Sequence, residues 1–469
     1  MFKKLLPLVI SLSLTACGSL GPNYQRPPLD TETKLTVKSN IPTATTNGLA
    51  WWHSFQDPVL NDLLEEALAN NQQIKLAVAR VEEARGTLAV TASDNAPSVD
   101  AVINASKNRY SENSSQSFPN SAGVSRNLQA GLSASYQIDL WGKLRRAGEA
   151  DHARLLSQQA NRDTVLITLS TDVAQNYFAL RAADQRMELI NATVKTRQDS
   201  LALQQKRFAA GIISQAQLHQ AEIELSTTEI AAEQLKQSRS MIESALAVLV
   251  GRTPSAIAHP VIVRGKTIAQ LQQHLTVPAE LSSDLLNRRP DLIAAEQNLI
   301  AVNADIGQAK TLFFPAIRLT AGTGYESQAL KTLIDPASLL WNIGASLAQP
   351  IYHRGSMKGI MKIAYARKDQ ALALYIQAVQ NAFRDTHDAL TQISAAEKIT
   401  AAQQRQFSAA QDNARLAELR YNSGYSSLVE SLDAQRDLFQ IQSYLIDAQY
   451  AQLTSVINLY KAVGGSWGK

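Results

Sequence analysis

The sequence predicts an α+β membrane protein with four β-strands in each chain and long helices in most of the remainder. Three observations support this fold class: an internal repeat, short segments with alternating apolar residues, and two proline-free helical segments of 66 residues each. An unpaired strand edge cannot face lipid, so four strands are too few to close a membrane barrel. The barrel is therefore expected to form only between copies of the chain.

The 469 residues contain two similar halves. Residues 63–106 align with residues 281–324 without a gap, and after a shift of about five residues the segment 207–211 aligns with 420–424. A period of about 200 residues is too long for a solenoid, so the halves are interpreted as a duplicated half-protein. The predicted organisation is a first repeat at 51–253, a linker at 254–280, a second repeat at 281–464 and a tail at 465–469.

The strand prediction depends on alternation. In residues 128–138 every even-numbered residue is apolar and every odd-numbered one is small or polar, which is typical of a strand with lipid on one face and water on the other. A half-buried soluble hairpin is the alternative, but four such segments, each long enough to cross a tilted bilayer, favour membrane strands. The four strands are predicted at about 97–110, 127–139, 315–325 and 338–350.

The long helices are predicted at 143–208 and 356–421, and each would measure about 100 Å. Shorter helices are predicted at 58–94, 212–249, 281–313 and 426–462. Two short helices end to end match one long helix, which gives four helical columns per chain and suggests a helical tube that continues the barrel. Gly211 and Gly424 are expected to end the long helices in the left-handed conformation.

The composition of the helices leaves one alternative and carries one further expectation. Their apolar positions are often alanine, which permits close packing on both flanks, although a soluble coiled-coil stalk has a similar composition. Aromatic residues make up 6% of the chain, and this low content predicts that no large conventional core is present.

The N-terminus has the features of a bacterial lipoprotein. Two lysines precede an apolar segment at residues 5–14, and Cys17 follows in the sequence Leu-Thr-Ala-Cys. Residues 1–16 are therefore predicted to be a signal peptide, with a nonlipidated signal as the alternative. Cys17, the only cysteine, would carry a diacylglycerol and an N-acyl chain, and no other cofactor is expected. Residues 17–50, which contain four prolines, are expected to form an extended, lipidated tether.

No enzymatic or nucleic-acid-binding site is expected. The seven histidines form neither an HExxH pair nor a His/Cys cluster, and the five methionines do not cluster, so no catalytic residue and no metal site is predicted. Loss of residues 1–16 would lower the formal net charge from +4 to +2, and no basic cluster with interleaved aromatic residues is present.

Six short motifs carry a family resemblance. They are Gly21-Pro22-Asn23-Tyr24-x-x-Pro27, Trp51-Trp52-x-x-Phe55-x-Asp57-Pro58, Asp139-Leu140-Trp141-Gly142, Leu286-x-x-Arg289-Pro290-Asp291, Phe313-Phe314-Pro315 and Leu432-Asp433-Ala434-Gln435. From Cys17 to near the C-terminus, the chain resembles the outer-membrane efflux lipoproteins of the TolC superfamily, OprM/NodT type. The resemblance implies a homotrimer with a 12-strand barrel in the outer membrane of a Gram-negative bacterium, above a periplasmic tunnel of 12 helical columns. Twelve columns about 10 Å apart leave a bore of roughly 25–30 Å and eight leave about half of that, and the sequence by itself favours neither number.

The resemblance also implies a function. It implies a duct that passively conducts drugs or other small toxic compounds from an inner-membrane pump, expected to be of the RND type, through a periplasmic adaptor. A type I protein-secretion duct of the same fold and a purely structural envelope lipoprotein are the alternatives.

A periplasmic gate is placed by the resemblance at Arg420, Tyr421, Glu430 and Asp433. The two acids are three residues apart and project onto the same face of a helix, so in a trimer they would form rings of negative charge. The alternative is that both acids lie on a solvated face beside Arg436. Counterparts in the first half are Phe208, Gln217 and Gln220, so the second hairpin is expected to carry most of the polar latch.

Overall fold

The computed structural model describes residues 19–29, 34–36, 51–109, 111, 124–273, 275, 277, 280–282 and 288–465, with only the backbone for 34–36 and 280–282. The chain divides into two compact units. Unit 1 comprises residues up to 28, 80–159 and 294–375, and unit 2 comprises 29–79, 160–293 and 376 onward. Cys17 and the predicted signal peptide lie outside the described residues.

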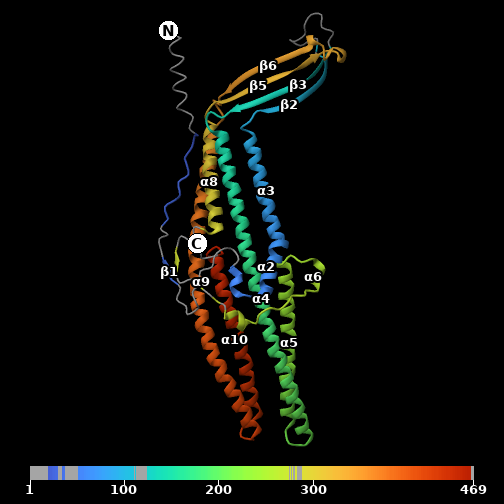
Figure 1. Cartoon of the computed structure of the whole chain (residues 1–469), viewed down its shortest axis with the longest axis vertical. Helices are drawn as coiled ribbons and strands as arrows, with labels where there is room; N and C mark the ends of the chain where they lie inside the picture. The colour runs from blue at the N-terminus through green and yellow to red at the C-terminus, as the bar shows by residue number, and fades with distance from the viewer. Residues whose placement is uncertain are drawn as a thin grey trace. The chain divides into compact units, whose positions relative to one another are not determined.

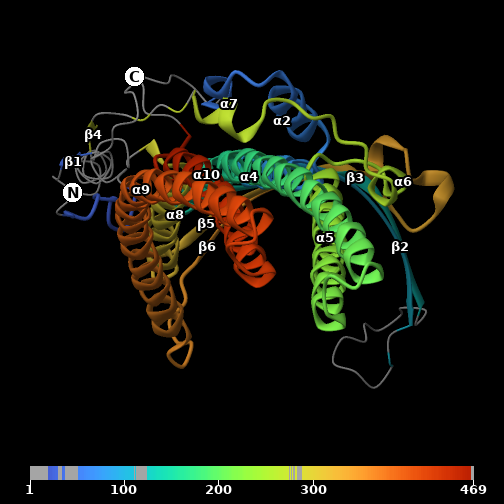
Figure 2. The same ribbon diagram turned by 90° about the horizontal axis from the view of Figure 1, so that it is seen from below.

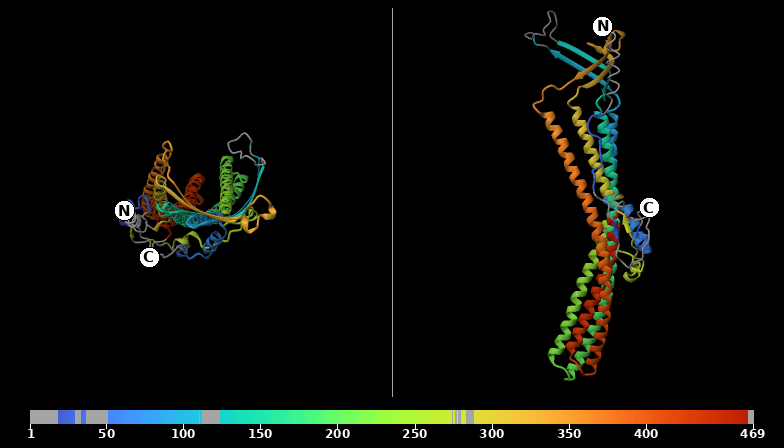
Figure 3. Two further views of the ribbon diagram at one scale, coloured as in Figure 1. Left: turned by 90° about the horizontal axis from the view of Figure 1, so that it is seen from above. Right: turned by 90° about the vertical axis from the view of Figure 1, so that its left-hand side faces the viewer.

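Unit 1 contains a four-stranded antiparallel sheet. Its strands, in spatial order, are β2 (Ser98–Arg109), β3 (Val124–Ile138), β5 (Ala316–Ser327) and β6 (Leu339–Ala348). Figures 1 and 3 show that the sheet is strongly curved. All four strands lie where the sequence predicts them, although β3 begins three residues early. Within the described residues, β2 and β6 are paired on one side only.

The central pairing of the sheet joins the two sequence halves. β3 pairs with β5 so that Gly131 lies opposite Gly324. A Cβ atom on Gly131 would lie 2.5 Å from the Thr323 carbonyl oxygen and 2.9 Å from the Gly324 Cα, so this close approach requires glycine. The short connection between β5 and β6 contains two 3₁₀ turns, η4 (Leu330–Thr332) and η5 (Pro336–Ser338).

Four helices accompany the sheet in unit 1. They are α3 (Gln72–Ser93), α4 (Lys143–Ala209), α8 (Pro290–Thr311) and α9 (Ser356–Asn422). In this unit Thr91 of α3 donates to Asp151 of α4, and Arg154 of α4 forms an ion pair with Asp305 of α8 at 2.5 Å. Ile306 of α8 packs against Ala364 of α9. These contacts give the lateral order α3, α4, α8, α9.

Unit 2 contains the remaining parts of α4 and α9 together with α2 (Pro58–Asn70), α5 (Gln215–Leu249) and α10 (Leu428–Ala462). Two short helices, α6 (Pro254–Ala258) and α7 (Ile268–Gln272), follow α5. Both long helices have 67 residues and end within one residue of the predicted positions. Figure 2 shows the α4–α5 and α9–α10 hairpins side by side.

Two helix predictions are wrong at their boundaries. The expected helix at 58–94 is two helices, because Asn71 has an extended backbone at the end of α2 and its Oδ1 accepts from Gln73 N at 2.7 Å in the first turn of α3. The expected helix at 281–313 begins only at Pro290. Its first residues instead belong to β4 (Glu280–Ser282), which pairs with β1 (Lys34–Thr36). Single-sequence periodicity does not detect a strand whose partner is about 250 residues away.

The expectation that no large core is present is also wrong. Unit 2 contains a cluster of buried aromatic and aliphatic residues in which Trp51 stacks on Tyr460 at 4.7 Å and Phe55 meets Phe178 edge-on at 5.1 Å. Six aromatic residues are buried together in this cluster, and composition gives no information about such clustering.

Asp57 ties this core together. It is fully buried, and its carboxylate accepts from Val59 N at the start of α2 (3.0 Å), from the Tyr177 hydroxyl (2.8 Å) and from Lys266 N (3.0 Å). Burial and the bond to Asp57 raise the pKa of Tyr177, so its hydroxyl remains a donor. One side chain thus connects α2, α4 and the segment before α7.

The described part of the predicted tether that lies in unit 1 is held by hydrogen bonds to two helices. Residues 19–26 lie along α4 and α8 in unit 1, where Arg146 donates to Leu20 O (3.1 Å) and Asn303 donates to Pro22 O (2.9 Å). Tyr24 donates to Glu296 at 3.0 Å. The Gly21-Pro22-Asn23-Tyr24 motif therefore fastens the segment to two helices.

We predict that Asp57→Ala destabilises the chain by about 2–3 kcal/mol, because one buried and two partly buried donors lose their acceptor. The thermal unfolding midpoint of the detergent-solubilised protein, followed by circular dichroism, should fall. Asp62→Ala on the exposed side of α2 is the matched control and should change stability by no more than about 0.5 kcal/mol. Equal midpoints for both variants would contradict the role of Asp57.

Candidate functional site

The two hairpins of unit 2 end in turns of identical geometry. Gly211 and Gly424 have φ values of +71° and +77° and follow the ends of α4 and α9, where the sequence predicts the turns. Ile212 N donates to Arg207 O and Tyr425 N donates to Arg420 O, at 2.9 and 2.8 Å. These bonds satisfy the last carbonyl groups of the long helices, and the left-handed residue requires glycine.

Gln217 in the first hairpin is occupied by helix capping. Ser214 precedes α5, and the Gln217 side chain accepts from Ser214 N at 3.0 Å in a capping box. In the second hairpin, Ser427 accepts from Glu430 N at 3.2 Å. The hydrogen bonds of the Gln217 side chain with Ser214 are therefore made within the first hairpin.

Tyr421 connects the two hairpins near their turns. Its hydroxyl accepts from Arg207 Nη1 at 2.7 Å and from Gln204 Nε2 at 3.1 Å, both on α4. The Arg207 guanidinium also lies 5.5 Å from the centre of the Tyr421 ring, within the range of a cation–π contact. Gln204 is buried, and its Oε1 has no donor among the described residues. The phenol thus holds α9 against α4.

Arg420 and Glu430 form a weaker contact inside the second hairpin. Arg420 Nε and Glu430 Oε1 are 3.6 Å apart, and both side chains are about half exposed. An exposed ion pair of this kind contributes little because water screens it. This pair supports the turn between α9 and α10 and makes no tie to the first hairpin.

Asp433 acts on the first hairpin through Arg436. Asp433 Oδ1 lies 2.8 Å from Arg436 Nη2, and Arg436 Nε lies 3.2 Å from Glu224 on α5. Glu224 is buried and also accepts from Gln220 Nε2 at 3.2 Å. Asp433 and Glu430 are both exposed, with Asp433 beside Arg436, as the solvated-face alternative describes.

A buried tie lies next to this ion pair. Arg197 of α4 is buried and donates from Nη1 to Gln435 Oε1 of α10 at 2.5 Å. Burial lowers the pKa of Arg197, and the Glu224 carboxylate opposes this shift. Gln435 belongs to the Leu-Asp-Ala-Gln motif, so the second hairpin presents that motif to α4.

Of the four predicted gate residues, only Arg420 and Glu430 contact each other. Tyr421 bonds to Gln204 and Arg207, and Asp433 reaches Glu224 through Arg436, which the sequence analysis names only as a neighbour on a solvated face. Sequence reasoning missed Gln204, Arg207 and Glu224, as well as Arg197, which bonds to Gln435. A signal for Arg207 was present, since it aligns with Arg420 in the repeat. Arg197, Gln204 and Glu224 are single polar residues in helices that carry many, and only their burial distinguishes them.

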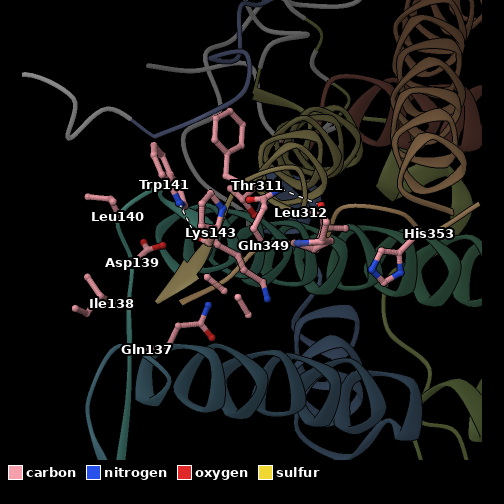
Figure 4. Close-up of a pocket in the computed structure, with 15 residues that line it drawn as sticks. Gln137, Ile138, Asp139, Leu140, Trp141, Lys143, Thr311, Leu312, Gln349 and His353 are labelled. Carbon is pink, nitrogen blue, oxygen red and sulfur yellow. Dashed lines mark hydrogen bonds between the residues drawn. The ribbon is translucent and has the colours of Figure 1, made fainter. Parts of the chain in front are cut away.

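A second cluster lies in unit 1, at the corner where β3 leads into α4 (Figure 4). Asp139 accepts from the Leu144 and Arg145 backbone amides at 3.1 and 3.0 Å, which caps the start of α4. Trp141 Nε1 donates to Pro315 O at 2.8 Å, and its ring lies 4.9 Å from that of Phe314. Two motifs from opposite halves of the sequence therefore meet at this corner, beside a cavity of about 430 Å³.

Neither cluster has the composition of a metal or catalytic centre. In the part of the chain that the structure describes, no three His, Cys, Asp or Glu side chains are placed to bind a metal ion. The described helices also include none with the length and apolar character needed to cross a membrane. The contacts between the hairpins can hold two helix pairs together, and because these contacts are polar they can be broken and reformed.

Amphipathic strands of membrane-crossing length, 67-residue helices and a polar tie between helical hairpins together define a channel-type protein of the cell envelope. The sequence matches the family model for outer membrane efflux proteins over residues 63–252 and 281–465. The chain belongs to the outer membrane efflux protein family. It is accordingly an outer-membrane component of an efflux system and not an enzyme.

Named relatives and a solved structure agree with this assignment. The chain is 32% identical to the probable outer membrane lipoprotein SilC of Salmonella typhimurium, with 100% of both chains covered. It is also 32% identical to the toluene efflux pump outer membrane protein TtgC of Pseudomonas putida, covering 100% of this chain and 96% of the relative. The crystal structure of the Campylobacter jejuni CmeC outer membrane channel has the same fold, with a TM-score of 0.89, 24% identity and 96% coverage of both chains.

We predict that Tyr421→Phe loosens the ends of α4 and α9, because Arg207 and Gln204 lose their shared acceptor. A loss of about 1 kcal/mol corresponds to roughly fivefold faster amide exchange in the last turns of both helices. Hydrogen–deuterium exchange with mass spectrometry would measure this rate. Tyr425→Phe, at a tyrosine that is 81% exposed, is the control and should leave the rates unchanged. Equal rates in the two variants would show that the phenol bonds do not hold the hairpins.

Proposed function

We propose that this protein is the outer-membrane duct of a tripartite efflux system and that it works as a homotrimer. The observation that carries the proposal is the sheet of unit 1, which leaves β2 and β6 each paired on one side only within the described residues. Three such sheets, joined edge to edge, give a closed barrel of 12 strands. Closure is what a membrane requires, since no backbone group may remain unpaired in hydrocarbon.

The strand side chains support the same proposal. Ile103 on β2 is 83% exposed, and Trp341 and Ile343 on β6 are 72% and 80% exposed. Side chains of this size on one face of a sheet need an apolar environment, and the alternating pattern supplies polar residues on the opposite face. We infer that the apolar face contacts lipid and the polar face lines a water-filled bore.

We infer further that the chain arose by duplication. Each half contributes one 67-residue helix, one 35-residue helix and one 22-residue helix, in addition to two strands. Equal lengths in the two halves make each half equivalent to one sixth of the proposed trimer. The helices of three chains would then form a periplasmic tunnel with 12 columns.

The partners follow from the family. The chain holds no recognised nucleotide-binding motif, so energy for transport must come from an inner-membrane pump, which we propose is of the RND type, acting through a periplasmic adaptor. We propose that the cargo consists of small organic toxic compounds, and the relative named as a toluene efflux protein supports this choice. Selectivity would belong mainly to the pump.

We propose that the ties between the hairpins form the periplasmic gate. Glu430 and Asp433 would face the bore as rings of negative charge, and Tyr421 and Arg436 would hold α9 and α10 against the first hairpin. The contacts of Tyr421 with Arg207 and of Arg436 with Glu224 support this proposal. Opening would require these polar bonds to be exchanged for water.

We propose that Cys17 carries the lipid anchor. The similarity to a protein named as an outer membrane lipoprotein supports it. Ser19, two residues later, lies against Gly142 at the corner between β3 and α4, so that a Cβ on Gly142 would be 2.7 Å from Ser19 Cα. Two residues reach at most about 7 Å, so the lipid would be attached close to this corner and to the base of the strands.

We predict that Asp433→Ala, or Arg420→Ala combined with Tyr421→Ala, raises single-channel conductance in planar bilayers. Asp433→Ala removes the carboxylate that positions Arg436 against Glu224, and the double variant removes the bonds of Tyr421 to α4. The loss of about 1 kcal/mol in a partly exposed ion pair corresponds to roughly a fivefold larger open fraction. Cells that carry either variant should also become sensitive to vancomycin. Asp437→Ala, one turn further along α10 at an exposed position, is the control.

The same conductance recordings distinguish an efflux duct from a structural envelope lipoprotein. A wild-type trimer that never conducts would favour a structural envelope lipoprotein. Unchanged conductance in both gate variants, with a conducting wild type, would remove these residues from the gate and leave the duct intact.

A separate prediction concerns the lipid. Cys17→Ser combined with a nonlipidated signal peptide should still assemble into trimers but reach the outer membrane less efficiently, because one of two anchoring devices is lost. Palmitate labelling and the amount of protein in outer-membrane fractions would measure this. Complete loss of label without any fall in the outer-membrane level would show that the lipid has no role in sorting.

A further inference from the structure

Two neighbouring residues of α10, in the second hairpin, bond to two buried charged residues of the first hairpin, Arg197 and Glu224. Arg436 of α10 forms an ion pair with Glu224 at 3.2 Å. Arg197 of α4, in the same hairpin as Glu224, donates to the adjacent Gln435 at 2.5 Å, and the Glu224 carboxylate opposes the lowering of the Arg197 pKa by burial. One buried carboxylate thus has a bonded cation across the hairpin interface and a second cation on its own side.

Arg197 is incompletely bonded in this arrangement. Its side chain is buried, and its Nη1 donates to Gln435, but its Nε finds no acceptor among the described residues. A buried N–H group without a partner is unfavourable, and the cost is larger when the group is charged. Arg197 Nε is therefore a buried donor without an acceptor among the described residues, and Glu224 is a buried carboxylate of the same hairpin whose charge acts on Arg197.

Arg436, in contrast, can leave Glu224 without becoming unpaired. It is half exposed and also contacts Asp433 at 2.8 Å on its own helix. Glu224 cannot follow it, because it is buried on α5 and accepts from Gln220 of the same helix at 3.2 Å. When the hairpins separate, Arg436 keeps Asp433 and water, whereas Glu224 loses the cation that is bonded to it in the closed state.

We propose that Glu224 exchanges partners as the gate opens, from Arg436 across the hairpins to the Nε side of Arg197 within the first hairpin. This inference rests on the proposed gate and adds its second state. The exchange keeps the Glu224 carboxylate paired with an arginine in both states. In the open state it also gives an acceptor to Arg197 Nε, which has none among the described residues in the closed state. Glu224 and Arg197 are then positioning residues that make the closed and open forms comparable in free energy.

The test must separate two roles of Arg197, because this residue also bonds to Gln435 across the hairpins. Gln435→Met removes that closed-state bond and serves as the background. In this background, adding Arg197→Met should lower the open fraction in planar bilayers about fivefold, since Glu224 loses its open-state partner. Arg197→Lys in the same background keeps a cation and should restore most of the open fraction.

Two further variants test the carboxylate itself. Arg436→Met should raise the open fraction, because Arg436 pairs with Glu224 only in the closed state. Glu224→Gln should make the channel insensitive to whether residue 197 is Arg or Met, because no carboxylate remains to be exchanged. Thermal unfolding midpoints and trimer content are recorded for every variant, so that a loss of folding is recognised.

The outcomes distinguish failure of the proposed partner exchange from failure of the proposed gate. If Arg197→Met in the Gln435→Met background leaves the open fraction unchanged or raises it while Arg436→Met opens the channel, the exchange is wrong and the gate stands. If Arg436→Met, Asp433→Ala and the Arg420/Tyr421 double variant all leave conductance unchanged, the gate itself is wrong. If Arg197→Met fails to form trimers, Arg197→Gln replaces it, and the same lowering of the open fraction is required.

Discussion

A backbone N–H or C=O group without a hydrogen-bond partner is not tolerated in hydrocarbon, and the rest of the structure depends on this constraint. The four strands satisfy one another from β2 to β6 and stop there. Their apolar side chains remain exposed in a single copy. In the proposed function, the remaining strand pairs come from other copies of the chain, and the long helices have to be compatible with the same symmetry. The proposed trimer is the arrangement in which both requirements are met.

The short motifs of the sequence form stabilising contacts at places where the chain changes direction or passes from strand to helix. Asp139 and Trp141 hold the corner between β3 and α4, and Asp57 holds the aromatic core of unit 2. Arg289, at the start of α8, donates to the Ala462 carbonyl near the end of α10 at 2.8 Å. Long helices built mainly from alanine and polar residues provide little specific packing by themselves. Such chains need a few strong polar contacts at defined positions, and the motifs provide them.

The proposed gate is asymmetric because the two hairpins contribute different chemistry. Three residues of the second hairpin each contact one residue of the first. The pairs are Tyr421 with Arg207, Arg436 with Glu224, and Gln435 with Arg197. Since most of these bonds are polar and lie near water, they can be exchanged without a change in the hydrophobic core of unit 2. Opening and folding can therefore be governed by separate sets of residues. The buried tie at Arg197 is the exception, because its unpaired Nε gives a physical reason for a second arrangement.

The sequence by itself determined the element types, the turns at Gly211 and Gly424 and the family, because alternation, proline-free helical length and glycine act locally or over one element. It did not determine the break at Asn71 or the pairing of β1 with β4, which depend on partners distant in the chain. It named Arg420, Tyr421, Glu430 and Asp433 but not what they bind. Glu224 and Arg197 differ from many other charged residues only in being buried between helices, and burial is a property of the tertiary structure.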